Sequence, residues 1–377
     1  MIQTNQDYKY QLDKSSRKCI CPRCGKKTFV LYLDDAGQSL SDDVGRCDRQ
    51  DKCKYHYAPN EYFKDRKAIG DMTDRKKASS KRSRPKQIPP DYISPEVFAS
   101  TLKGYECNSL MIFLHSVFDG LIGADEVNRV AMQYGVGTSK MFGGSPVFWQ
   151  IDSFGKIRTG KVMGYNRATG KRVKEPKNEF QWVHAMKELK EQRPDFRLQQ
   201  CYFGSHRLIA VEKQFRQLNQ ERKALYLDEV TPAVALFESE KACLIVAMAL
   251  AWGGMDNLFI PVSCGGCEGF NPTDDKKRDL FDGIRLLKNR RVVIFPDEGK
   301  FNEWMRKAQA LKGFSEEVYI STLMERGLHP HTVECEYKPG DAIDDLILGY
   351  IRDGQGGREV ADLIITSYGY KNQYKIV

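Results

Sequence analysis

Four short apolar runs in the second half of the chain are separated by segments whose apolar residues recur at helical spacing. The runs lie at 234–237, at 257–263, within 290–299 and at 317–321. The two helical patterns consist of Leu244, Ala247, Met248 and Ala251, and of Phe301, Trp304, Ala308 and Leu311. Because parallel strands are joined by crossover helices of this length, we predict an α/β domain whose parallel sheet carries helices on both faces.

A different pattern precedes this domain. Residues 147–177 form short runs rich in Val, Ile, Phe and Tyr that are interrupted at 153–156 and at 167–170. Short strands bounded by turn residues are typical of a β-meander. From position 91 onward, helical and strand patterns alternate without a repeat. We therefore predict an α+β region upstream of the parallel sheet.

The predicted meander carries a concentrated positive charge. Between positions 156 and 177, eight lysines and arginines accompany a single acid, Glu175, with aromatic residues among and just before them. A basic sheet edged with aromatic rings suits a polynucleotide backbone with bases stacked nearby. The alternative is a set of solvated hairpin faces. The candidate nucleic-acid contacts are Lys156, Arg158, Lys161, Arg167, Lys171, Arg172 and Lys174.

Most of the net charge of +9 lies in residues 64–90, where ten Lys and Arg oppose three Asp. This segment has no aromatic residue and few large aliphatic ones, so it cannot bury enough surface to fold alone. We predict a flexible basic linker. It serves either as a solubilising tether or as an electrostatic arm that holds nucleic acid through counterion release.

The first ten residues have no apolar signal-peptide core. The longest uninterrupted apolar stretch, 242–252, has eleven residues, which is too short to span a bilayer. We therefore expect a cytoplasmic protein without a membrane partner. In a reducing compartment, clustered cysteines bind metal more often than they form disulfides.

The N-terminal segment combines two cysteine pairs with a strand-like pattern. Cys21 and Cys24 form a knuckle on a tight turn that Gly25 permits, and 27–33 alternates as a strand does. We expect only one of Cys19 and Cys21 to reach the ion. The alternative is that these cysteines are buried and unpaired. A segment of this size would then have no cross-link or metal ion to stabilise its fold. The predicted zinc ligands are Cys21, Cys24, Cys47 and Cys53, with His56 in reserve.

A further pair with knuckle spacing, Cys264 and Cys267, has no second pair nearby. It follows directly on an apolar run. We therefore predict a turn at this position, with a metal or redox role as the alternative.

Acidic residues follow two of the predicted parallel strands. Glu238 ends the first apolar run and Asp297 ends the third. Ligands of such sheets bind at the carboxyl ends of the strands, and two buried acids there require a cation or donor. Oxygen ligands around a partly hydrated ion describe Mg²⁺. The alternative is that both acids only cap the following helices. A third acidic group, Asp341, Asp344 and Asp345, stands where a loop enters a helix.

At these residues the sequence resembles the TOPRIM fold of primases, topoisomerases and some nucleases. "FESEKA" (237–242) is similar to its first motif, "VVIFPDEG" (292–299) to its second, and "KPGDAIDDLI" (338–347) to a segment of phage primases. The resemblance covers about 19–57 and 230–350. It implies that Glu238 is a general acid/base or metal ligand and that Asp297 binds Mg²⁺. It departs from the pattern at Gly299, where the second aspartate of Asp-x-Asp is expected, so Asp341 or Asp344 would supply the missing oxygen.

The resemblance and the composition together divide the chain into five regions. They are a zinc-ribbon domain (1–63), a basic linker (64–90), an α+β template-binding region (91–225), a TOPRIM-like domain (226–350) and a C-terminal tail (351–377).

The leading hypothesis is a primase-like protein of a mobile element. It would hold single-stranded DNA or RNA and use Mg²⁺ or Mn²⁺ with nucleoside triphosphates for primer synthesis, with a helicase as a further partner. A non-catalytic nucleic-acid-binding protein for replication or mobilisation is the first alternative, and Gly299 favours it. A TOPRIM-type nuclease is the second.

Overall fold

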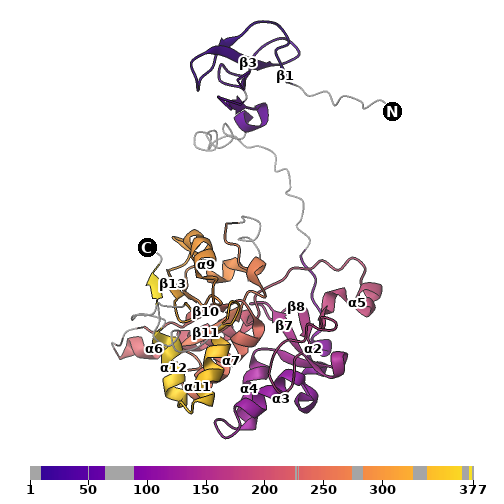
Figure 1. The fold of residues 1–377 in the computed structure, drawn as a ribbon, viewed down its shortest axis with the longest axis vertical. Coiled ribbons are helices and arrows are strands. Elements are labelled where there is room, and N and C mark those ends of the chain that lie inside the picture. Colours follow the sequence, from indigo (N-terminus) through magenta and orange to yellow (C-terminus); the bar gives the residue numbers. More distant parts are fainter. Residues whose placement is uncertain are drawn as a thin grey trace. The chain divides into compact units, whose positions relative to one another are not determined.

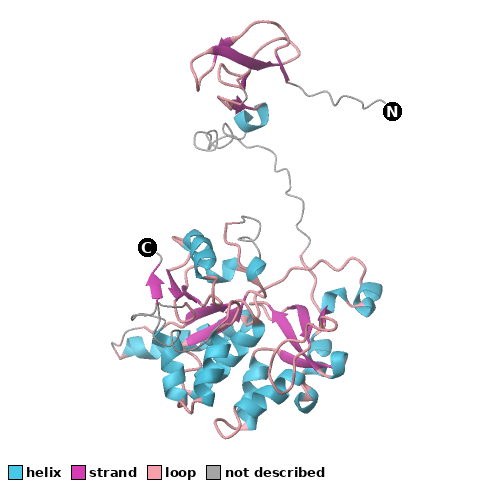
Figure 2. Cartoon of the chain, in the orientation of Figure 1, coloured by secondary structure: helices cyan, strands magenta, loops and turns pink. Residues whose placement is uncertain are grey.

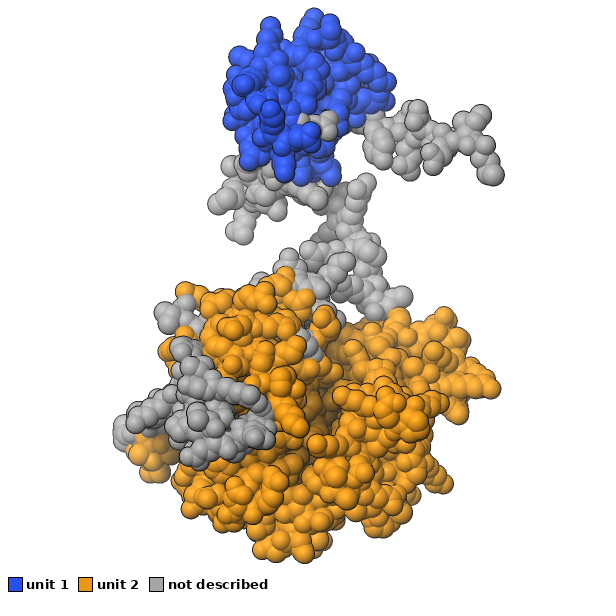
Figure 3. Space-filling model, in the orientation of Figure 1, with its two compact units in different colours: residues 1–87 blue, residues 88–377 orange. Residues whose placement is uncertain are grey.

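The computed structural model describes residues 10–49, 51–63, 89–225, 227, 229–273, 283–325, 338–366 and 373–375. The chain divides into two compact units, residues 1–87 and residues 88–377 (Figure 3). The predicted basic linker, 64–90, lies outside the described residues except for its last two positions. None of the helices in the described part of the chain has the length and hydropathy that crossing a bilayer requires.

The first unit is a small antiparallel ribbon, as the alternation at 27–33 predicted. Its strands are β1 (Gln11–Leu12), β2 (Cys19–Ile20), β3 (Lys27–Leu33), β4 (Gly45–Cys47) and β5 (His56–Tyr57). They are ordered β1-β3-β4-β5, and β2 pairs with β3. Phe29 and three cysteines form the buried centre of the ribbon. Gly45 is required here, because a Cβ would collide with the Val30 carbonyl and the Phe29 ring.

The second unit begins with helices packed around a four-stranded antiparallel sheet ordered β6-β7-β8-β9. The strands are β6 (Val136–Ser139), β7 (Ser145–Ile151), β8 (Ile157–Met163) and β9 (Phe180–Trp182). The helices are α2 (Pro95–Thr101), α3 (Ser109–Val117), α4 (Ala124–Gln133) and α5 (Lys187–Gln192). The predicted meander is therefore present, with its first turn where 153–156 interrupts the apolar runs.

The same unit contains a second sheet, ordered β11-β10-β12-β13-β14. Its strands are β10 (Ala233–Phe237), β11 (Phe259–Ser263), β12 (Arg291–Ile294), β13 (Glu317–Ser321) and β14 (Gln373–Lys375). β10 pairs in parallel with β11 and β12, and β12 with β13, whereas β14 is antiparallel. The four apolar runs are the four parallel strands, and the predicted α/β class is confirmed.

Helices cover both faces of this parallel sheet (Figures 1 and 2). They are α6 (Ser205–Ala224), α7 (Glu240–Trp252), α9 (Phe301–Ala308), α11 (Ile343–Arg352) and α12 (Gly357–Thr366). Alternate residues of β10 enter separate cores. Ala235 and Phe237 join the core formed with α7, α11 and α12, whereas Val234 and Leu236 join the core formed with α6 and α9. A central strand buried on both faces explains the uninterrupted apolar run.

Six short 3-10 helices complete the described elements. They are η1 (Tyr105–Cys107), η2 (Met141–Gly143), η3 (Val183–Ala185), η4 (Cys267–Gly269), η5 (Ile284–Leu287) and η6 (Gln309–Leu311). The last of these continues α9, so that Leu311 is buried with Trp304 and Ala308, as the helical spacing predicted.

The prediction that 351–377 is a C-terminal tail is wrong for the described part of this segment. Val360, Ala361 and Ile364 of α12 are fully buried in the core beside α7. β14 then adds an antiparallel strand beside β13. The apolar positions of α12 recur at helical spacing, and this signal places 357–366 in the fold. The predicted region 91–225 also differs from the observed packing, since α6 packs against the parallel sheet.

Candidate functional site

The ribbon brings its four predicted zinc ligands together. The Sγ atoms of Cys21, Cys24, Cys47 and Cys53 lie within 4.8 Å of one another. Those of Cys21 and Cys53 are 3.7 Å apart. Four thiolates at the usual Zn–S length of about 2.3 Å would lie about 3.8 Å apart in a tetrahedron. The donor set therefore fits one zinc ion, and the four clustered cysteines are those that the sequence predicted.

Nearby donors and burial act on the thiol pKa values in opposite directions. The backbone N–H of Lys26 lowers the pKa of Cys24 to about 6. The Thr28 hydroxyl, 3.3 Å from Cys47 Sγ, lowers the pKa of that thiol. Burial raises the pKa of Cys53 to about 11. Zinc binds thiolates, so a bound ion would favour the ionised form of each of these cysteines.

The reserve ligand His56 lies outside the cysteine cluster. Its Nε2 is 2.9 Å from the Tyr32 hydroxyl, and the two rings stack with their centroids 6.0 Å apart. Arg46 pairs with Val30 on one side and with His56 on the other, so these side chains share one face of the ribbon. That face is partly exposed and offers aromatic and cationic groups.

Glu238 and Asp297 lie at the carboxyl ends of β10 and β12, which pair with each other. The strand order reverses here, because β11 lies on one side of β10 and β12 on the other. Such a switch point is where open α/β sheets bind ligands. Ser239 begins α7 by accepting a hydrogen bond from the Ala242 N–H at 3.1 Å. The Ser263 hydroxyl donates to the Glu238 carbonyl at 2.9 Å, which fixes the backbone of this acid.

Asp297 stands in a negative environment. Burial raises its pKa to about 8, and the charges of Glu238, Asp344 and Asp345 contribute to the same shift. Acids from three parts of the chain therefore act on this carboxyl group. A divalent cation would favour the ionised form and offset the repulsion.

The carboxylate of Glu238 has an oxygen with neither a hydrogen bond nor an ion pair among the described residues. Within the described part of the chain, Glu238 Oε2 is buried and has no hydrogen-bond partner. The acids do not form a closed cage, since the four cysteines are the only described set of three or more ligand atoms within 4.8 Å. Mg²⁺ typically takes one or two carboxylates and keeps several waters. An orphaned oxygen beside Asp297 therefore fits a partly hydrated hard cation.

The three acids before and within α11 have different positions. Asp344 is buried, and its Oδ2 lies 2.7 Å from the ammonium of Lys241. Asp345 accepts from the Ala342 N–H at 3.0 Å and caps the helix, and burial raises its pKa. Asp341 accepts from the Lys338 N–H at 2.8 Å through its side chain. Asp345 is thus part of the helix cap, whereas Asp341 stabilises the turn that precedes the helix.

Lys241 is the residue at this site that the sequence analysis missed. Burial alone would lower its pKa, but Asp344 and the other α11 acids raise it overall, so the side chain remains an ammonium. The sequence carried one signal for it, since Lys241 is a charged residue in a helix that is otherwise almost wholly apolar.

The loop that contains Gly299, where the sequence departs from Asp-x-Asp, is hydrogen-bonded to the residues just before α11. The Glu298 N–H donates to the Asp341 carbonyl at 2.8 Å, and the Gly340 N–H donates to the Glu298 carbonyl at 3.2 Å. Gly299 is exposed and has φ 77°, a conformation that favours glycine. β12 ends at Ile294, so Glu298 lies on the loop that follows the strand.

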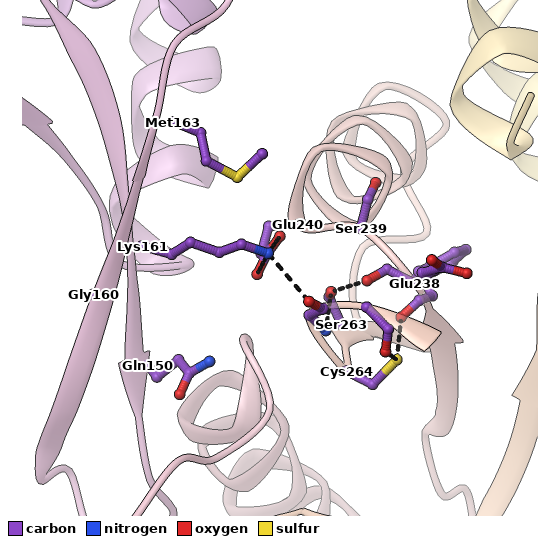
Figure 4. Close-up of polar contacts among 12 residues, drawn as sticks. Gln150, Gly160, Lys161, Met163, Glu238, Ser239, Glu240, Ser263 and Cys264 are labelled. Carbon is purple, nitrogen blue, oxygen red and sulfur yellow. Dashed lines mark hydrogen bonds and ion pairs between the residues drawn. The ribbon is translucent and has the colours of Figure 1, made fainter. Parts of the chain in front are cut away.

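Two of the seven predicted nucleic-acid contacts are buried instead. Arg158 forms an ion pair with Asp152, with Nη2 and Oδ2 2.7 Å apart. Lys161 Nζ lies 2.9 Å from both oxygens of Glu240 and 3.2 Å from the Gly265 carbonyl (Figure 4). Both predictions are corrected, because these side chains point into the fold. Glu238 points away from this ion pair.

The other predicted contacts lie at or near the surface. Lys156, Arg167, Lys171 and Lys174 are exposed, and Arg172 is half-buried with Nη2 2.9 Å from Asn178 Oδ1. The aromatic edge is largely absent, since Phe148, Trp149 and Tyr165 are core residues. Of the predicted rings only Phe154 is exposed, at 72%. A basic surface therefore exists, but most of its predicted stacking partners do not.

A cleft of about 730 Å³ opens beside the α11 acids. Asp341, Asp345 and Arg352 line one wall, and Thr169 and Lys171 line the other. Two hydrogen bonds stabilise the turn that carries Thr169: Asn166 Oδ1 accepts from the N–H groups of residues 168 and 169. The cleft thus places cationic and acidic groups opposite each other.

The pair with knuckle spacing forms a turn, as predicted. Cys264 is buried, with its thiol 3.4 Å from the Phe237 carbonyl. Residues 267–269 form η4, and the side chain of Cys267 lies outside the described part of the structure.

A family model described as Domain of unknown function (DUF6371) matches residues 108–298. The chain belongs to this family. The DUF6371 span includes Lys161, Glu238 and Asp297, and it ends before Asp344. A model described as a zinc beta-ribbon finger matches residues 8–68, which include the four cysteines. A search of curated proteins finds no match.

The chain is similar to solved structures of primases. A DNA primase domain from Pseudomonas aeruginosa is 13% identical with a TM-score of 0.32, and the match covers 65% of this chain and 59% of that one. The Escherichia coli primase catalytic core is 9% identical with a TM-score of 0.35, covering 72% and 82%. The zinc-binding and RNA polymerase domains of the Aquifex aeolicus primase are 14% identical with a TM-score of 0.34, covering 97% and 81%.

Proposed function

We propose that this DUF6371 protein is a primase-like nucleotidyltransferase that acts on a single-stranded nucleic-acid template with Mg²⁺ or Mn²⁺. The observation that carries the proposal is the orphaned Glu238 oxygen beside Asp297, at the switch point of a parallel sheet. This arrangement supports a TOPRIM-like site. Its natural occupant is a hydrated divalent cation, and such ions commonly bind together with substrate phosphates.

In this proposal Glu238 and Asp297 hold the ion, and the cleft beside α11 receives the nucleoside triphosphate. A bound Mg²⁺ would stabilise negative charge on the phosphate oxygens during phosphoryl transfer. Lys171 and Arg352 line the cleft and would bind phosphate oxygens, and Thr169 would donate a hydroxyl hydrogen bond. Asp341 and Asp345 line the same cleft and would orient bound water or the ion.

The template would bind elsewhere on the chain. Arg46, Tyr32 and His56 form a partly exposed face of the zinc ribbon whose rings suit base stacking. The exposed cations Lys156 and Lys174 lie at the antiparallel sheet and would bind phosphates. We propose that these two surfaces hold single-stranded DNA or RNA in the replication of a mobile element.

The test is primer synthesis on single-stranded templates by the zinc-loaded protein with nucleoside triphosphates and Mg²⁺ or Mn²⁺. Oligonucleotide products are expected from the wild type, and Glu238→Ala should reduce them by at least 100-fold. Glu188→Ala, which removes an exposed acid on α5, is the matched control and should leave them unchanged. Absence of products on every template, with both ions, would contradict the proposal. Mg²⁺-dependent cleavage of the template that Glu238→Ala removes would instead indicate a nuclease.

Gly299 supports a second candidate, a non-catalytic nucleic-acid-binding protein. The exposed glycine offers no oxygen ligand where an Asp-x-Asp pattern has its second acid. Under this alternative, Asp297→Ala leaves both DNA affinity and biological activity intact. Under the leading proposal the same variant retains DNA affinity but loses synthesis, so one purified variant separates the two.

A further inference from the structure

Lys241 and Asp344 form an ion pair inside the acidic site. Lys241 is the second residue of α7, and Asp344 is the second residue of α11. The side chains are 16% and 2% exposed, and Nζ lies 2.7 Å from Oδ2. The pair therefore joins the first turns of two helices that start at the same edge of the parallel sheet.

The position of this lysine is unfavourable by itself. The N-terminal end of a helix carries partial positive charge, so a cation in the first turn of α7 is repelled by the helix dipole. Burial of the ammonium adds a desolvation cost. The lysine is held there by acids of α11, with Asp344 in direct contact. The presence of a buried cation in this unfavourable position indicates that the surrounding carboxylates need a positive charge nearby even before a metal ion binds.

The same contact divides the acids into two groups. Neither Asp344 Oδ2 nor Glu238 Oε2 has a hydrogen bond of regular geometry among the described residues, but Asp344 Oδ2 lies 2.7 Å from an ammonium and Glu238 Oε2 has no ion pair. Two-metal centres hold their ions about 3.5 to 4 Å apart and supply carboxylate oxygens to both. A second ion on Asp344 would have to displace the ammonium or lie beside it, and like charges repel strongly at that distance.

We infer that Lys241 is a built-in counter-cation that occupies Asp344 and limits this site to one divalent ion, held by Glu238 and Asp297. This inference rests on the proposed function and deepens it. Lys241 is a positioning residue, since it acts through Asp344. The exposed Gly299, which offers no ligand, is in accord with a site built for one ion.

The test counts Mn²⁺ ions on the full-length, zinc-loaded protein by calorimetric titration and by electron paramagnetic resonance. The wild type should bind one Mn²⁺. Lys241→Met frees Asp344 and should bind two, and Lys241→Arg, which keeps the charge, should still bind one. Two ions on the wild type would overturn the inference. A single ion on a folded Lys241→Met protein, with unchanged affinity, would overturn it as well.

Two further variants separate this inference from the proposed function. Asp297→Asn should bind the single Mn²⁺ at least 10-fold more weakly than the wild type, whereas Asp344→Asn should retain the ion. These variants also keep the test decisive where Lys241→Met fails to fold, because loss of the ion in Asp344→Asn would make Asp344 a ligand and overturn the inference. If the wild type binds no Mn²⁺ at all, the metal site fails and with it the proposed function. If the wild type binds two Mn²⁺ ions, only the role inferred for Lys241 is overturned, and the proposed function stands.

Discussion

The carboxyl group of Asp297 shows how much of this site depends on electrostatics that a sequence does not encode. Its position after an apolar run was enough to predict that it lies at the carboxyl edge of the sheet. Its pKa of about 8 results first from burial and then from Glu238, Asp344 and Asp345, which are distant along the chain. Only the fold brings these charges together.

At this scale we predict the pH dependence of stability. The pKa of Asp297 is raised from 3.8 to about 8, so between these values the folded chain binds one proton more than the unfolded chain. The carboxyl group therefore makes the protein less stable as pH rises through that window. Asp297→Asn should remove this dependence. It should melt higher than the wild type above pH 8 and equally near pH 4, in zinc-loaded protein without added divalent ions.

Mg²⁺ gives the control for this prediction. An ion that binds the ionised carboxylate stabilises the wild type by mass action, by about 2.7 kcal/mol at 100 times its Kd. The gain in melting temperature should be larger at pH 8.5 than at pH 6, and absent in Asp297→Asn. Parallel melting curves for the two proteins across pH would contradict the assignment.

At the scale of elements, the ion pair of Lys161 and Glu240 joins β8 to the start of α7. The two residues are 79 positions apart, and the lysine also donates to the Gly265 carbonyl at the end of β11. A basic run in the sequence gives no sign of which of its lysines points inward. Apolar periodicity predicted the strands well because it reports burial directly, whereas the partner of a charge is set by tertiary packing.

Lys161→Met should destabilise the second unit. It leaves the Glu240 carboxylate buried without its partner, which costs about 3 to 5 kcal/mol in comparable buried pairs. Chemical denaturation measures the change, and Lys174→Met, which removes an exposed lysine, should alter stability by less than about 0.5 kcal/mol. The double variant Lys161→Met/Glu240→Leu should recover much of the loss. Equal stability of Lys161→Met and the wild type would rule out this role.

At the scale of the whole molecule, the chain consists of two compact units with different sources of stability. The first is built around four thiols, and the second around three apolar clusters, two of them on the faces of the parallel sheet and one at the antiparallel sheet. The sequence predicted an antiparallel ribbon with these four cysteines, because the Cys21–Cys24 knuckle and the alternation at 27–33 are local signals. It did not predict that 357–366 joins the core, because the composition of the C-terminal segment resembled a tail.

Zinc removal should therefore affect the two units differently. We expect one zinc per chain by elemental analysis, and loss of that zinc in Cys47→Ser. Cys107→Ser, which alters an exposed cysteine outside the cluster, should keep it. In calorimetry, a chelator should abolish the transition of the first unit, since structural zinc supplies folding energy. The transition of residues 88–377 should remain within about 1 °C, and its loss would show that zinc stabilises both units.

The pairing of β14 with β13 has a consequence for self-association. An unpaired outer strand is a template on which another chain can add a strand. Here Tyr319, Ile320 and Ser321 of β13 face β14, and on the opposite margin Ser263 of β11 bridges Phe203. β14 is the outer strand of the described sheet, and its three residues offer another chain a shorter template than β13 would. Removal of 373–377 would expose the backbone of β13 along this edge. Purified protein shortened in this way should aggregate on storage, whereas the intact chain should remain in solution.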